Sequence, residues 1–169
     1  ASDVVWILNY LAIAHARLGN IDAAIADLEQ AATIPESIGG NVGQVINLGF
    51  LYCYLGRPDA AVERVNGPMG QMTPHGRTLR ALVLLCAASQ RGDRGEMKRM
   101  ERVIRQTATD PTLVIDAHLW AGDVPAAERA LLRMLANPEY LPDALQYATP
   151  SRRTPGMPGR ARFDDNRDA

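Results

Sequence analysis

The 169-residue sequence lacks most features by which enzymes and membrane proteins are recognised. Aromatic residues make up only 5%, and a single lysine, Lys98, stands beside 17 arginines. No apolar run reaches the roughly 18 residues of a membrane span, and no signal peptide is visible at the start. Walker, GxSxG and GxGxxG motifs are missing. We therefore expect a soluble, non-enzymatic protein without a cofactor or a small-molecule substrate.

Cysteine and histidine are also scarce. Cys53 and Cys86 form no CxxC pair and lie in apolar helical patterns. We expect two buried free thiols, because free cysteine behaves as a small hydrophobic side chain. His15, His75 and His118 show neither HxxxH nor HExxH spacing, so no metal site is predicted.

Charge is unevenly distributed, although the net charge is only −1. Residues 77–105 carry eight basic and three acidic groups, whereas the ranges on either side are acidic. Five basic residues here form what we call the basic stripe: Arg91, Arg94, Lys98, Arg102 and Arg105. A solvated outer face is the simplest interpretation, and docking of an acidic partner is the next. Nucleic acid is less favoured, because stacking aromatic residues are missing there.

One segment recurs along the chain. LGNIDAAI at 18–25 returns as LGRPDAAV at 55–62 and AGDVPAAE at 121–128, with an eroded copy, RGDRGEMK, at 91–98. The glycines of these segments are spaced by 37, 36 and 30 residues: Gly19, Gly56, Gly92 and Gly122. Periods of 20–50 residues indicate stacked repeats.

Each of these glycines lies between two apolar patterns of helical period. A glycine can close the first helix in the left-handed conformation, and the Asn or Asp that follows can cap the second. Pro58 and Pro125 suit the first turn of second helices. Thr73-Pro74 and Asp110-Pro111 suit the starts of the third and fourth units. No stretch alternates with period two, so the sequence predicts an all-α fold.

This pattern resembles the tetratricopeptide repeat, a helix–turn–helix of about 34 residues. The first unit matches the family at Leu8, Leu11-Ala12, Gly19-Asn20, Ala24, Leu28 and Ala31. The second matches at Leu48-Gly49, Tyr52, Gly56, Ala61 and Val65, and the fourth at Gly122-Asp123, Ala127 and Leu131. The third unit keeps Leu84 and Gly92-Asp93. The resemblance implies a short right-handed α-solenoid of about four repeats.

We expect repeat units at about 3–36, 41–70, 74–109 and 111–138, followed by a capping helix at 139–149. Residues 150–169 are rich in Pro, Gly and charge, which predicts a mostly disordered tail. This tail could wrap back along the repeats, and Phe163 is its one plausible anchor. Small residues at 12, 49 and 127 suit a close crossing of helices. His15 and His118 share a packing position with Tyr52.

In the family that the sequence resembles, the first helices of the repeats line a concave groove. The corresponding contact residues are mostly apolar with two amides: Trp6, Asn9, Ile13, Ile46, Asn47 and Phe50. Such a groove suits an amphipathic helix or an extended peptide. The alternative is that the chain's own segments cover it. Asn47 matches one residue of the family's chaperone-carboxylate clamp, but the basic members are absent, so that function is not expected.

The sequence therefore predicts a protein–protein interaction module that acts as an adaptor, a scaffold or a small chaperone. The alternative is a regulatory repeat domain of a larger signalling or enzymatic protein. The excess of Arg over Lys suggests a GC-rich bacterial genome, and a cytoplasmic location is favoured. No particular oligomeric state is predicted.

Overall fold

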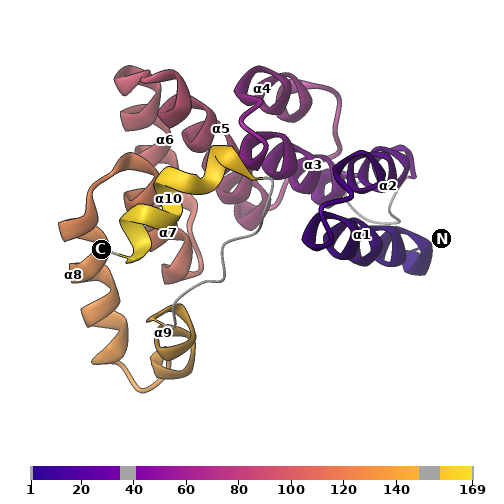
Figure 1. Cartoon of the computed structure of the whole chain (residues 1–169). Coiled ribbons are helices and arrows are strands. Elements are labelled where there is room, and N and C mark those ends of the chain that lie inside the picture. The colour runs from indigo at the N-terminus through magenta and orange to yellow at the C-terminus, as the bar shows by residue number, and fades with distance from the viewer. Residues whose placement is uncertain (1, 35–40, 149–156, 169) are drawn as a thin grey trace.

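The computed structural model describes residues 2–34, 41–148 and 157–168, and every regular element in these ranges is a helix (Figure 1). The elements are α1 (Ser2–Arg17), α2 (Ile21–Thr33), α3 (Val42–Tyr54), α4 (Pro58–Asn66), α5 (Pro74–Arg91), α6 (Arg94–Thr107), α7 (Pro111–Ala121), α8 (Val124–Leu135), α9 (Leu141–Ala148), the 3-10 helix η1 (Pro158–Arg160) and α10 (Ala161–Asp168). The prediction of an all-α fold is confirmed. Within the described ranges, no helix combines the length and apolar character needed to cross a membrane.

Consecutive helices pack in pairs: α1 with α2, α3 with α4, α5 with α6, and α7 with α8. The turn glycine of each pair has a positive φ, which confirms the left-handed conformation predicted for all four. These values are 81° at Gly19, 72° at Gly56, 69° at Gly92 and 79° at Gly122. A side chain is strained in this conformation, so the sequence turns where a glycine is available. The handedness of the array and its division into four repeats stay predictions.

Most of the predicted helix starts are confirmed in detail. The side chain of Asp93 accepts a hydrogen bond from the Glu96 amide at 3.0 Å, and that of Asp123 accepts one from the Ala126 amide at 3.1 Å. Thr73 and Asp110 cap α5 and α7 in the same way. Asn20 differs, because its side chain makes no capping hydrogen bond to α2. Four of the five polar residues expected to cap a helix therefore do so.

The first helices α3, α5 and α7 pack side by side, and the largest buried cluster lies around them. Gly49 of α3 permits this close packing. A Cβ atom added there would lie 2.5 Å from Val65 Cγ1 and 3.1 Å from Val83 Cγ1. The crossing of α3 with α4 and α5 therefore has no space for even one methyl group.

Cys53 of α3 and Cys86 of α5 are joined by a disulfide, so the prediction of two free thiols is wrong. The two cysteines are 33 residues apart, close to one repeat, and their Cα atoms lie 6.4 Å apart on neighbouring first helices. Near-equal positions in successive repeats face each other, which is why two distant cysteines can pair. Disulfides persist mainly in oxidising compartments, which weighs against the cytoplasmic location favoured from the sequence.

The C-terminal residues 157–168 are ordered into η1 and α10, in contrast to the disordered tail predicted for 150–169. Figure 1 shows α10, in yellow, crossing α7, while η1 contacts α3. Phe163 is only 5% exposed, so its expected role as an anchor agrees with the structure. We call residues 157–168 the C-terminal segment. The part of the predicted tail at 150–156 lies outside the described residues.

Candidate functional site

A cavity of about 370 Å³ lies between α1 and α3. Four of the six predicted contact residues line it: Asn9 and Ile13 from α1, and Asn47 and Phe50 from α3. We call this space the α1–α3 cavity. It is mainly apolar, and it ends at Met157 and Arg160 of the C-terminal segment.

The two predicted amides meet at this cavity. The side chain of Asn47 donates a hydrogen bond from Nδ2 to Oδ1 of Asn9, over 3.2 Å. Asn9 is only 4% exposed, and its own Nδ2 is buried without a hydrogen-bond partner. An unsatisfied buried donor is costly, so an acceptor that entered the cavity would relieve this cost.

The other two predicted contacts lie elsewhere. Ile46 is 1% exposed, belongs to the buried core and does not line the cavity. The helical period placed it on the groove face, but α3 is enclosed by α2, α4 and α5, and this buries most of its circumference. Trp6 is 52% exposed on α1 and does not line the cavity.

Tyr54 and Arg160 also line the cavity, and the sequence analysis did not predict either of them. Tyr54 lies one helical turn beyond Phe50 and could have been found from that spacing. Burial raises the pKa of Tyr54 to about 12, so the phenol stays neutral. The guanidinium carbon of Arg160 lies 5.2 Å from the centroid of the Tyr54 ring, within cation–π distance. Nothing in the sequence indicates this contact.

Beyond the cavity, a row of aromatic rings crosses the first helices. Phe50 and Tyr54 lie 5.8 Å apart between ring centroids, Tyr54 and Trp120 lie 6.2 Å apart, and Trp120 and Phe163 lie 4.8 Å apart. The last ring belongs to the C-terminal segment. The aromatic side chains are few, and they gather where this segment meets α3 and α7.

A carboxylate lies beside these rings. Asp116 of α7 accepts a hydrogen bond from the Tyr147 hydroxyl of α9. Burial raises the pKa of Asp116 to about 6, although this hydrogen bond and the positive charges of Arg160 and Arg167 act in the opposite direction. The pKa of Tyr147 is also raised, by burial and by the negative charge of Asp116. The C-terminal segment thus places two arginines around a carboxyl group that is poorly solvated.

The basic stripe lies on a different surface. Arg94, Lys98, Arg102 and Arg105 are exposed on α6. Arg91, at the end of α5, instead pairs with Asp59 of α4. The stripe that the sequence predicted is therefore reduced to the four residues of α6.

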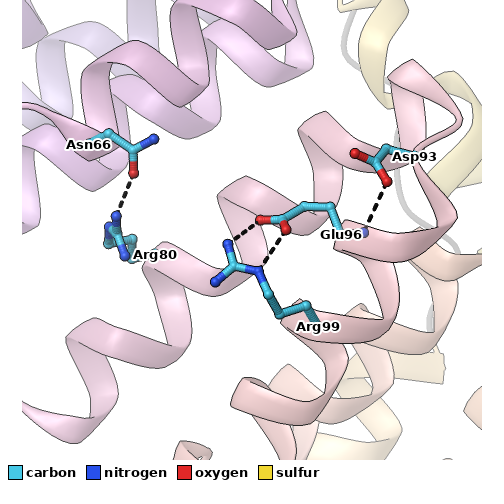
Figure 2. A network of polar contacts seen from close by, with 5 residues as sticks. All are labelled: Asn66, Arg80, Asp93, Glu96 and Arg99. Carbon is cyan, nitrogen blue, oxygen red and sulfur yellow. Dashed lines mark hydrogen bonds and ion pairs between the residues drawn. The ribbon is translucent and has the colours of Figure 1, made fainter.

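Figure 2 shows the polar contacts where α4, α5 and α6 meet. Arg99 makes a two-point ion pair with Glu96, at 2.7 and 2.6 Å, and Asp93 caps the same helix. Arg80 of α5 donates to the side chain of Asn66 and, at 2.8 Å, to the carbonyl of Val65. Arg80 thus connects α5 to α4, whereas Arg99 is paired within α6. Both arginines are engaged within the chain, so they do not form a vacant anion site.

Two of the three histidines make contacts between neighbouring helices. His15 Nδ1 lies 2.9 Å from Asp27 Oδ2 of α2, and His118 Nδ1 lies 4.0 Å from Glu101 Oε1 of α6. Both contacts agree with the packing role that we predicted. Across the described ranges, no group of three potential metal ligands is found.

Comparison with known proteins identifies the first hairpin. A sequence model described as tetratricopeptide repeat matches residues 4–34, which span most of α1 and all of α2. No curated protein and no solved structure matches the chain. The residues from Leu8 to Ala31 that carried the resemblance all lie within the match.

Proposed function

Because the chain is a tetratricopeptide repeat family protein, we propose that it binds a peptide or helix of a protein partner in the α1–α3 cavity. Repeats of this family generally mediate protein–protein interactions. The proposal includes the finer architecture, a right-handed solenoid of four hairpins whose first helices form one concave side. An adaptor, scaffold or small chaperone would use such a surface.

The observation that carries the proposal is the unpaired Nδ2 group of Asn9, a residue that lines a mainly apolar cavity. Ile13 is 50% exposed and Phe50 is partly buried, so both can contact an apolar side chain. The Asn9 Nδ2 donor would bind a backbone carbonyl beside it. Together these groups fit a peptide that presents an apolar anchor next to its main chain.

The experiment uses peptides selected from a random library on the full chain, with their binding measured by fluorescence anisotropy. Ile13→Glu puts a charge into the cavity and should weaken binding at least about tenfold, because burying an unpaired charge is costly. Ile7→Glu is the matched control, since Ile7 lies on the same helix and is 56% exposed, but does not line the cavity. Equal effects of the two substitutions would show that the cavity is not the binding site.

A second candidate surface is the set of four exposed basic residues on α6, which fits an acidic partner. Its binding should weaken steeply as salt rises, because exposed charges are screened within about 10 Å at 0.1 M salt. Nucleic acid is less favoured there, because α6 carries no aromatic residue for stacking. A regulatory role within a larger signalling or enzymatic protein would use the same surfaces.

A further inference from the structure

We propose that the C-terminal segment is a removable internal ligand of the groove along α3, α5 and α7. We further infer that the external partner of this groove is a peptide in which a Gly-Arg pair is followed, three residues after the arginine, by an aromatic residue. Both statements rest on the proposed function, since they extend the same concave binding side beyond the α1–α3 cavity.

The segment has one buried apolar anchor, Phe163, and hydrogen bonds from Asn166 to the Leu119 carbonyl and from Arg167 to the Tyr147 carbonyl, each at 2.8 Å, also hold it. Of its twelve residues only Phe163 and Asp164 are buried, and the rest are exposed or partly exposed. Phe163 contacts Trp120, with ring centroids 4.8 Å apart. A segment that belonged to the core would bury a helix face along its length. A single aromatic side chain seated on a helix array is instead typical of peptide recognition.

Arg160 and Phe163 of the segment pack against each other in this contact. Arg160 lies against two rings, with its guanidinium carbon 5.2 Å from the Tyr54 centroid and 5.3 Å from the Phe163 centroid. Its Nε also donates to Asp164 Oδ1 at 2.9 Å, which fixes the guanidinium over the rings. Residues three positions apart share one side of a helical turn. The groove thus accepts a cation and an aromatic ring at this spacing.

The residue before the arginine must be a glycine. A Cβ atom on Gly159 would lie 2.1 Å from the carbonyl oxygen of Cys53 and 2.5 Å from the amide nitrogen of Gly56. Gln90 Nε2 of α5 bridges the segment and α3, because it donates to the carbonyls of Gly159 at 3.1 Å and of Cys53 at 2.8 Å. The groove therefore recognises the backbone of the segment as well as its side chains.

The C-terminal segment forms one wall of an aromatic pocket on α3, α5 and α7. The chain has nine aromatic residues, and five of them line this pocket: Phe50, Tyr54, Trp120, Tyr147 and Phe163. Arg160 lines both this groove and the α1–α3 cavity. A partner that extended from the cavity along α3 would therefore meet the segment and compete with it.

The test uses a fluorescent peptide of residues 157–169, MPGRARFDDNRDA. Its binding to the full chain is measured by anisotropy for the natural sequence and for two variants that release the segment, Phe163→Ala and Gly159→Ala. Circular dichroism checks that each variant keeps its helices. Gly95→Ala is the matched glycine control, because a Cβ there would meet only the Asp93 side chain, at 3.4 Å.

We expect both releasing variants to bind the peptide at least about tenfold more tightly than the natural chain, because a tethered segment competes at an effective concentration of order millimolar. Gly95→Ala should behave like the natural chain. Equal affinity of the peptide for all four chains would overturn the internal-ligand assignment. The assignment would also be overturned if both releasing variants kept their helices and neither bound the peptide. A concentration-dependent dimer of the natural chain that disappears in Phe163→Ala would also overturn it, because the segment would then be exchanged between copies.

Variants of this peptide test which side chains of a partner the groove recognises. Their binding is measured on the Phe163→Ala chain. The Phe163→Ala and Arg160→Ala peptides should each bind at least about fivefold more weakly than an Arg162→Ala peptide, which removes an exposed arginine of the same charge. If all three peptides bind alike, the inferred arginine–aromatic recognition is wrong. Failure here would leave the comparison of Ile13→Glu with Ile7→Glu unaffected, since that comparison tests the α1–α3 cavity.

Discussion

Phe163 rests on Trp120, with 4.8 Å between the ring centroids, and this contact joins the C-terminal segment to α7. Trp120 is 4% exposed. Phe163→Ala should expose Trp120 and shift its fluorescence emission to longer wavelength. The measurement is made in a Trp6→Phe background, so that Trp120 is the sole reporter. An unchanged emission maximum would mean that the Phe163 ring does not shield Trp120.

The disulfide between Cys53 and Cys86 ties two first helices together. A crosslink that closes a loop of about 33 residues is expected to stabilise the fold by ~2–4 kcal/mol. Reduction should therefore lower the urea midpoint of the natural chain. A Cys53→Ala, Cys86→Ala double variant, which has no disulfide, should show no response to reductant. A natural chain that is equally insensitive would show that the two thiols are not joined in solution.

Asp116 should make the free energy of unfolding decrease as pH rises from about 4 to 6. Its pKa is raised from 3.8 to about 6 in the folded chain. The folded state therefore binds the proton more tightly than the unfolded state, so this contribution is fully present below about pH 4 and is lost as pH rises through 6.

Asp116→Asn should remove this dependence and keep an acceptor for the Tyr147 hydroxyl. At pH 8 the variant should be more stable than the natural chain by about 1–2 kcal/mol, a figure reduced from the full shift because Asp116 is only partly buried. Urea unfolding between pH 4 and 8 measures the difference. Asp143→Asn, an exposed carboxyl on α9, is the control. If the difference in free energy of unfolding between Asp116→Asn and the natural chain stays constant from pH 4 to 8, the raised pKa of Asp116 is contradicted.

Small residues at the helix crossings should tolerate no enlargement. Gly49→Ala places a methyl group 2.5 Å from Val65 Cγ1, and Ala24→Leu adds bulk at a site with no exposed surface. Each should destabilise the fold by ~1–3 kcal/mol in urea unfolding. Gly95→Ala on the exposed side of α6 should instead be neutral or stabilising, because alanine favours a helix. A neutral Gly49→Ala would mean that α3 and α4 are packed less closely than described.

The sequence could predict what depends on local chemistry. Gly19 and Gly122 adopt the expected left-handed turns, and α5 and α7 begin at the expected prolines. These features follow from the conformational limits of glycine and proline, which act within a few residues. The contact between Asn9 and Asn47 was also within reach, because the repeat places both amides on first helices.

The features that the sequence did not predict depend on contacts between distant segments of the chain. Helical period identified the face that carries Ile46, but it could not show that neighbouring helices cover this position. The pairing of Cys53 with Cys86 required the register between two repeats. The C-terminal segment packs against Trp120, and a composition rich in charge and proline gave no sign of that partner.

We propose that partners bind on the concave side of the first helices. The most direct measurement follows the side-chain amide resonances of Asn9 and Asn47 by NMR while a library-selected peptide is added. Both amide resonances should shift, with backbone shifts at Ile13 and Phe50 and none along the exposed residues of α6. Shifts confined to α6, with Asn9 and Asn47 unmoved, would contradict the proposal.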